Sequence, residues 1–161
     1  MTIGSFAALV SMVAFVVTAM FVLFQVRHMR MARNVDISMK LFEWLENEHV
    51  RRAMKWVRSQ FRFKSLGDHE AYLAKNPDAE DNPMVVIGFF EQVGLLVQKK
   101  FVDVDVVMDH LGLQITTMWE KLKPLVSALR ESHDDARIGE HFEFLYHQAL
   151  DYEHKHPRAK S

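Results

Sequence analysis

The sequence contains no cysteine, and it has only 6 glycines and 4 prolines. Without thiols the chain cannot form disulfides, cysteine-based zinc fingers or a cysteine nucleophile, and the absence fits a reducing compartment. The glycines never cluster as a phosphate-binding loop requires. The sequence therefore offers no motif for thiol catalysis or nucleotide binding, and we expect no cofactor.

A strong charge of either sign is also missing, because the net charge is -1. All 21 acidic residues follow position 33, whereas three of the 20 basic residues, Arg27, Arg30 and Arg33, precede position 34. The remainder of the chain consequently has a net charge of -4. A nucleic-acid-binding domain normally shows a basic balance, so we expect no nucleic-acid partner.

Charged side chains are absent from Ile3 to Phe24, and Gln25 is the first strongly polar residue of this stretch. A helix needs about 20 apolar residues to cross the hydrocarbon core of a bilayer. The alternatives are a buried core helix and a secretory signal peptide, but a signal peptide carries its basic residues before the apolar run. Here they follow it, so we expect Ile3–Val26 to be an uncleaved transmembrane helix with the lipid bilayer as its partner.

The three arginines that follow the apolar run predict its orientation. Basic residues flanking a membrane helix favour the cytoplasmic side. Arg27, Arg30 and Arg33 therefore place the N-terminus outside and the C-terminal domain in the cytoplasm.

Small residues recur within the apolar run at intervals of 3 and 4 residues. Close backbone approach at small side chains drives the association of membrane helices. We expect this seam to make the protein a homo-oligomer, although small residues are also common in anchors that do not associate. The predicted packing seam consists of Gly4, Ala7, Ser11, Ala14 and Thr18, and its continuation reaches Gln25.

Beyond position 33 the apolar residues recur with helical periodicity. Asn47 and Asp103 are predicted N-caps, and Asn82-Pro83 is a predicted helix start with asparagine as the cap. We expect Gly112 to end a short helix and Pro124 to kink or break the next one. The predicted helices cover residues 37–45, 48–64, 84–98, 104–111, 115–129 and 135–153, and residues 65–83 form a connector with about one helical turn.

These patterns predict an all-α fold: one N-terminal transmembrane helix followed by a small cytoplasmic bundle of about five or six helices. Residues 1–33 would be the anchor and a basic juxtamembrane stalk. Residues 34–153 would be the helical domain, and residues 154–161 a polar tail.

Four stretches resemble a bacterial family of uncharacterised single-pass membrane proteins. They are Lys40–Leu45, Phe89–Val97, Trp119–Pro124 and Glu140–Glu143. The resemblance implies a bacterial inner-membrane protein with one N-terminal membrane helix and a helical C-terminal domain of unknown function. It implies no activity and no catalytic residues.

Basic residues line one face of the predicted helix 48–64. Arg51, Lys55, Arg58 and Arg62 share a stripe opposite its apolar residues. Beside a membrane anchor, such a stripe could rest on anionic lipid headgroups together with Arg27, Arg30 and Arg33. The alternatives are a solvated face or internal pairing with the acidic residues between 68 and 81.

Glu91 lies in the middle of the most apolar predicted helix, 84–98. A buried carboxylate is costly unless it is paired or protonated. Glu91 could therefore transfer protons or bind a ligand. Alternatively, it lies on a narrow polar edge and bonds to a nearby polar side chain.

His147, Asp151 and His154 have the spacing of one helical face, and their types suit zinc. Nine histidines make such coincidences common, so we assign no metal ligand and no catalytic residue. The function we expect is a membrane-tethered, non-enzymatic interaction or scaffolding module with an unidentified protein partner. The alternative is a membrane-anchored metal-binding enzyme or hydrolase that uses His, Asp or Glu side chains.

Overall fold

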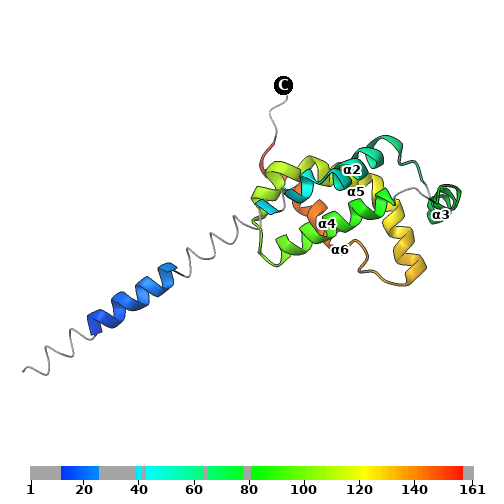
Figure 1. Cartoon of the computed structure of the whole chain (residues 1–161). Coiled ribbons are helices and arrows are strands. Elements are labelled where there is room, and N and C mark those ends of the chain that lie inside the picture. Colours follow the sequence, from blue (N-terminus) through cyan, green and yellow to red (C-terminus); the bar gives the residue numbers. More distant parts are fainter. Residues whose placement is uncertain (1–11, 26–38, 41–42, 64, 78–80, 158–161) are drawn as a thin grey trace, which may run out of the picture. The chain divides into compact units, whose positions relative to one another are not determined.

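The computed structural model describes residues 12–25, 39–40, 43–63, 65–77 and 81–157. Its contacts divide the chain into two units, Met1–Met39 and Lys40–Ser161 (Figure 1).

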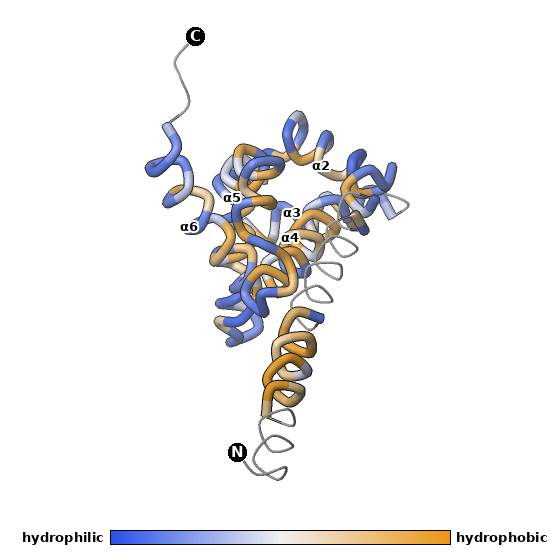
Figure 2. Tube along the Cα trace, turned by 90° about the vertical axis from the view of Figure 1, so that its left-hand side faces the viewer, coloured by the Kyte–Doolittle hydropathy of each residue, from blue (hydrophilic) through white to orange (hydrophobic). Residues whose placement is uncertain are grey.

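In the N-terminal unit, residues 12–25 form a helix of mostly hydrophobic residues (Figure 2). The large apolar side chains of this helix are exposed. The expected transmembrane helix Ile3–Val26 is not supported, because no helix in the described ranges is both long and apolar enough to cross a bilayer. The expected location in a bacterial inner membrane, with an outside N-terminus and a cytoplasmic domain, is wrong for the same reason.

In the C-terminal unit the all-α prediction is confirmed, since its described residues form helices, turns and bends. Helix α4 packs between α2 and α6, and α5 packs mainly against α6 and also contacts α2 (Figure 1). A short helical segment, 43–46, precedes them. The helices are α2 (Glu48–Gln60), α3 (Leu66–Lys75), α4 (Asn82–Gln98), α5 (Val104–His133) and α6 (Glu140–Lys155).

Side-chain caps explain where four of the helices begin. A polar side chain before a helix accepts a hydrogen bond from one of its unpaired first N–H groups. Asn47 and Asp103 play this part for α2 and α5, as predicted. Ser65 caps α3, and Asp81 caps α4, so the prediction of Asn82 as the cap was wrong by one residue.

The core is an aromatic cluster in which three helices meet. Phe90 of α4 stacks on Phe142 of α6 with ring centroids 4.6 Å apart, and Trp119 of α5 meets Phe142 edge-on at 5.0 Å. All three side chains are buried. Such rings contribute large apolar areas and favourable ring geometry at once. They hold α4, α5 and α6 together.

Helix α5 does not stop where the sequence suggested. It passes through both Gly112 and Pro124 as one helix, although Figure 1 shows it changing direction along its length. Glycine costs only about 1 kcal/mol within a helix. The burial of Leu111 and Ile115 on either side of Gly112 outweighs that cost, so the predicted break at Gly112 was wrong.

Candidate interaction site

A groove of about 540 Å³ lies between α2, α5 and the segment 43–46. Arg51, Lys55 and Arg58 lie on successive turns of α2 and bring three exposed cationic side chains to it. Met54, which is buried, and Leu45 supply apolar surface. This groove, called the α2 groove below, is lined by Leu45, Glu46, Arg51, Met54, Lys55, Arg58 and Gln114.

The spacing of α2 explains how cations come to line an apolar surface. The helix buries Ala53, Met54 and Val57 on one side. Arg51, Lys55 and Arg58 are spaced i, i+4, i+7 and therefore form one row beside that buried side. The methylene stems of such side chains can lie along apolar surface while their charged ends stay in water.

The α2 groove is lined by three cationic side chains and one carboxylate, that of Glu46, so positive charge is in excess. Among the residues that the structure describes, Arg51, Lys55 and Arg58 form no ion pair, whereas the neighbouring Arg52 pairs with Glu48 at 3.8 Å. Lys121 of α5 adds a fourth cationic group nearby, since its Nζ donates to the carbonyl of Arg58 at 2.8 Å. The groove therefore presents positive charge to whatever approaches it.

Arg62, the remaining basic residue predicted for this helix, is not part of the α2 groove. The exposed Arg62 follows the end of α2, and its Nη1 donates to the carbonyl of Phe61 at 2.8 Å. Arg27, Arg30 and Arg33 lie outside the described residues.

Half of the predicted packing seam can be placed. Ala14, Thr18 and Gln25 lie in the helical segment 12–25, where the Thr18 hydroxyl donates to the carbonyl of Ala14 at 2.8 Å. That hydrogen bond occupies the hydroxyl within its own helix. Gly4, Ala7 and Ser11 lie outside the described residues.

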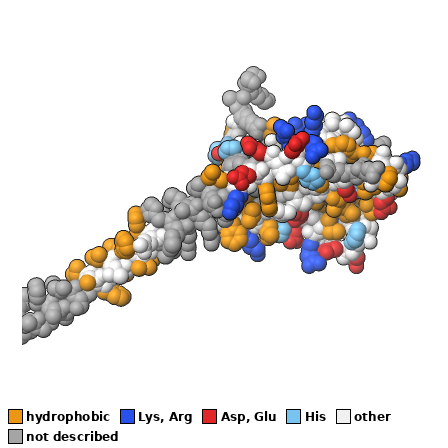
Figure 3. Space-filling view, viewed as in Figure 1, with side chains coloured by type: hydrophobic (Ala, Val, Ile, Leu, Met, Phe, Trp, Pro, Cys, Tyr) orange, Lys and Arg blue, Asp and Glu red, His pale blue; other side chains and the backbone are white. Residues whose placement is uncertain are grey.

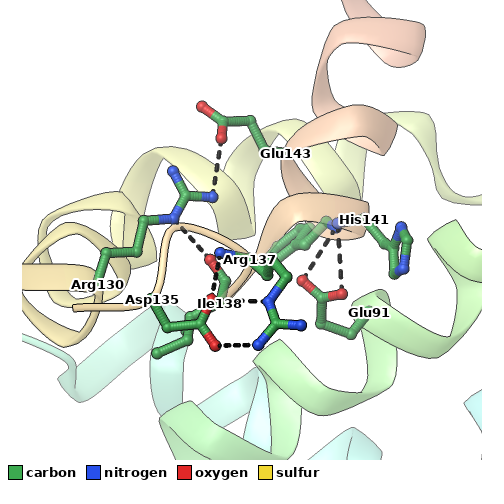
Figure 4. A network of polar contacts seen from close by, with 8 residues as sticks. Glu91, Arg130, Asp135, Arg137, Ile138, His141 and Glu143 are labelled. Atoms are coloured by element: carbon green, nitrogen blue, oxygen red, sulfur yellow. Dashed lines mark hydrogen bonds and ion pairs between the residues drawn. The ribbon is translucent and has the colours of Figure 1, made fainter. Parts of the chain in front are cut away.

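The side chain of Glu91 lies at the start of α6 (Figure 4). Its carboxylate accepts hydrogen bonds from the main-chain N–H groups of His141 and Phe142, at 3.3 and 3.5 Å. Gly139, the residue before α6, offers no side-chain cap. Glu91 therefore caps α6 from α4, and its half-burial raises the pKa of the carboxyl although the two N–H groups act against that rise.

A second groove, of about 590 Å³, lies between α5 and α6 and was not predicted from the sequence. Within it the Tyr152 hydroxyl donates a hydrogen bond to the Asp109 carboxylate, and this bond raises the pKa of Tyr152. Among the residues lining this α5/α6 groove are Asp109, Gly112, Leu113, Gln114, Tyr152 and Glu153. One residue could have indicated this groove from the sequence. Leu113 is a large apolar residue that lies off the apolar face of α5, which suggests an exposed apolar surface there.

No three His, Asp or Glu side chains within the described ranges are grouped so that they could hold a metal ion. His147, Asp151 and His154 lie on α6 as their spacing suggested, yet they do not form such a group. The sequence alternative of a metal-dependent enzyme therefore gains no support from the described part of the chain.

Residues 6–148 match the sequence profile of DUF4760, a domain of unknown function. No curated protein and no solved structure matches the chain significantly. The match confirms an uncharacterised domain, and it does not extend to a membrane family.

Proposed function

The chain belongs to the DUF4760 family of unknown function, and from that premise we propose that its helical domain is a non-enzymatic interaction module whose α2 groove binds an acidic, amphipathic segment of a protein. The occupant would set carboxylates against the cations of α2 and apolar side chains against Met54 and Leu45. This mode corresponds to a helix lying in a groove, recognised through residues on one of its faces.

One observation carries the proposal: Arg51, Lys55 and Arg58 line an apolar-floored groove in one row, without ion pairs in the described part of the chain. Carboxylates spaced i, i+4 on an approaching helix would match the spacing of this row. Each exposed ion pair contributes only about 0.2–1 kcal/mol, so the apolar contacts must supply the remainder. The expected binding is therefore weak to moderate and depends on salt.

The composition of the groove favours a protein over a nucleic acid. None of the described residues that line it is aromatic, so they offer no ring on which a base could stack, and the acidic Glu46 is one of them. The acidic balance after position 33 also disfavours a nucleic-acid partner. No observation on the described residues favours the alternative of a metal-binding enzyme or hydrolase.

A fluorescent, acidic amphipathic peptide with glutamates at i, i+4 and leucines on one side tests the proposal by fluorescence anisotropy with the full chain. We expect binding that weakens as salt rises, because salt screens exposed charges over about 8 Å at physiological ionic strength. The triple variant Arg51→Gln/Lys55→Gln/Arg58→Gln should weaken binding by about tenfold or more, as expected when several exposed pairs are lost together.

Arg52→Gln is the matched control, because Arg52 lies on the same helix but pairs with Glu48 and does not line the groove. It should bind the peptide as the wild type does. Equal loss in the control and the triple variant would contradict the proposal. So would binding to anionic lipid vesicles that is tighter than binding to the peptide and depends on the same three residues.

A further inference from the structure

The two grooves meet on helix α5. Gln114 lines both the α2 groove and the α5/α6 groove. The surface that joins them is therefore continuous, and the outer side of α5 lies at its centre.

The two grooves carry opposite charge. Arg51, Lys55 and Arg58 line the α2 groove. On the other side of Gln114, Asp109 and Glu153 bring exposed carboxylates to the α5/α6 groove. The hydrogen bond from Tyr152 to Asp109 holds one of these carboxylates in place. Figure 3 shows acidic, basic and hydrophobic side chains interspersed over one face of this unit.

Leu113 provides an apolar centre beside Gln114. Its side chain is 59% exposed, and it lines the α5/α6 groove. Its neighbour Gly112 has no atom within 4 Å of the position that a Cβ would occupy, so nothing inside the domain requires glycine there. Protein interfaces typically have an apolar centre and a polar rim. Here the exposed Leu113 and the uncovered backbone at Gly112 form the apolar centre, and charged residues surround it.

We propose that two copies of this chain associate about a two-fold axis at Leu113 and Gln114, so that the exposed carboxylates of Asp109 and Glu153 on each copy face the cations of the α2 groove of the other. This inference rests on the proposed function and names the occupant of the α2 groove. In a two-fold interface the same surface serves both copies, and features on opposite sides of the axis are brought together. The basic half of each copy therefore meets the acidic half of the other copy, and the interface contains this contact twice.

The arrangement also gives Leu113 a partner of its own kind. At a two-fold axis each residue near the axis meets its own copy, so the two Leu113 side chains would shield one another from water. Gly112 allows the two α5 helices to approach closely at that point. The charges then determine the orientation and the choice of partner more than the affinity.

A cross-linking experiment on the full chain, kept in a mild non-ionic detergent because residues 12–25 expose apolar side chains, tests the inference. The chain has no cysteine, so a Gln114→Cys variant can form a disulfide only with its own copy. We expect rapid disulfide-linked dimers under mild oxidation. Ala136→Cys, at an exposed position between α5 and α6, is the control and should cross-link at least tenfold more slowly.

Charge exchange makes the test specific. On the Gln114→Cys background, Lys55→Glu/Arg58→Glu leaves both grooves acidic, and Asp109→Lys/Glu153→Lys leaves both basic. Each double variant alone should lose at least tenfold in cross-linking rate. An equimolar mixture of the two, one of them carrying a mass tag, should regain the rate and give mixed dimers only.

Three results would overturn the inference: no faster cross-linking at Gln114→Cys than at Ala136→Cys, no recovery in the mixture, or no effect of Leu113→Asp on the rate. If any of these occurs while the acidic peptide still binds through Arg51, Lys55 and Arg58, the occupant of the α2 groove is a different protein. If peptide binding fails as well, the proposed function fails with the inference.

Discussion

Gly94 of α4 lies directly against the carbonyl group of His141 in α6. A Cβ built on Gly94 would stand 2.2 Å from that oxygen and 2.6 Å from the carbonyl carbon. Such distances do not occur between real atoms, and the obstacle is backbone that cannot rotate away. The absence of a side chain at Gly94 therefore sets how closely α4 and α6 pack.

The first prediction follows from this contact. Gly94→Ala should lower the free energy of unfolding by about 2 kcal/mol, because the clash must push two packed helices apart. Gly88→Ala, six residues earlier on the same helix, meets nothing within 4 Å and should raise stability by about 0.5–1 kcal/mol. Urea unfolding of the full chain, followed by circular dichroism, measures both. Changes of the same sign would contradict the role assigned to Gly94.

The second prediction concerns Glu91 and pH. Burial raises the pKa of its carboxyl above the ordinary value of 4.5. The folded state therefore holds the proton more tightly than the unfolded state, and this group's contribution to stability falls as pH rises from about 4.5 through the folded pKa. Glu91→Gln cannot titrate, so its stability relative to the wild type should improve across that window. Urea midpoints of both proteins between pH 4 and pH 7 test this, and a constant difference between them would refute it.

The third prediction concerns Arg130, which ties the end of α5 to α6 (Figure 4). Its Nε donates to the carbonyl of Ile138 at 2.7 Å, and its Nη2 pairs with Glu143 at 2.9 Å. Both groups are partly buried, so Arg130→Met should lower the free energy of unfolding by about 1–2 kcal/mol. Arg137→Ala removes only an exposed pair with Asp135 and should leave the thermal midpoint unchanged. Equal losses in the two variants would argue against a special role for Arg130.

The fourth prediction compares two left-handed positions beside the same turn. Gly139 has φ of 73°, and a Cβ there would lie 2.7 Å from a methyl group of Val126, so Gly139→Ala should cost about 2 kcal/mol. Asp134, at the end of α5, has φ of 49°, a conformation that glycine adopts more easily than a residue with a Cβ. Asp134→Gly should therefore be neutral or stabilising by up to about 1 kcal/mol. Differential scanning calorimetry distinguishes the two, and a destabilising Asp134→Gly would show that its side chain stabilises the turn.

The parts of the fold that depend on local chemistry could be predicted from the sequence. Met54, Val57 and Phe61 recur at helical spacing, and all three are buried. Asn47 and Asp103 precede their helices and cap them as expected. Each of these features is decided within a few residues of the chain, where periodicity and capping carry the information.

Features that depend on distant parts of the chain could not be predicted. Helix α6 begins at Glu140 rather than near Asp135, because the Asp135 carboxylate accepts a hydrogen bond from the main-chain N–H of Arg137 and the backbone of Gly139 is left-handed. The partners of Glu91 are main-chain N–H groups 50 positions away, and no side-chain pattern reveals them. The acidic groove likewise forms only when α5 and α6 pack together. The basic row on α2 was visible in the sequence, but the groove beside it was not.

The cap that Glu91 gives to α6 has a consequence for how the chain folds. A short helix is costly to start, and α6 has no cap of its own at Gly139. Its first turn is therefore stabilised only after α4 has arrived beside it. The contacts of α4 and α6 then form in one cooperative step, so we expect both helices to be protected from hydrogen exchange to the same degree, and neither should persist as an isolated peptide.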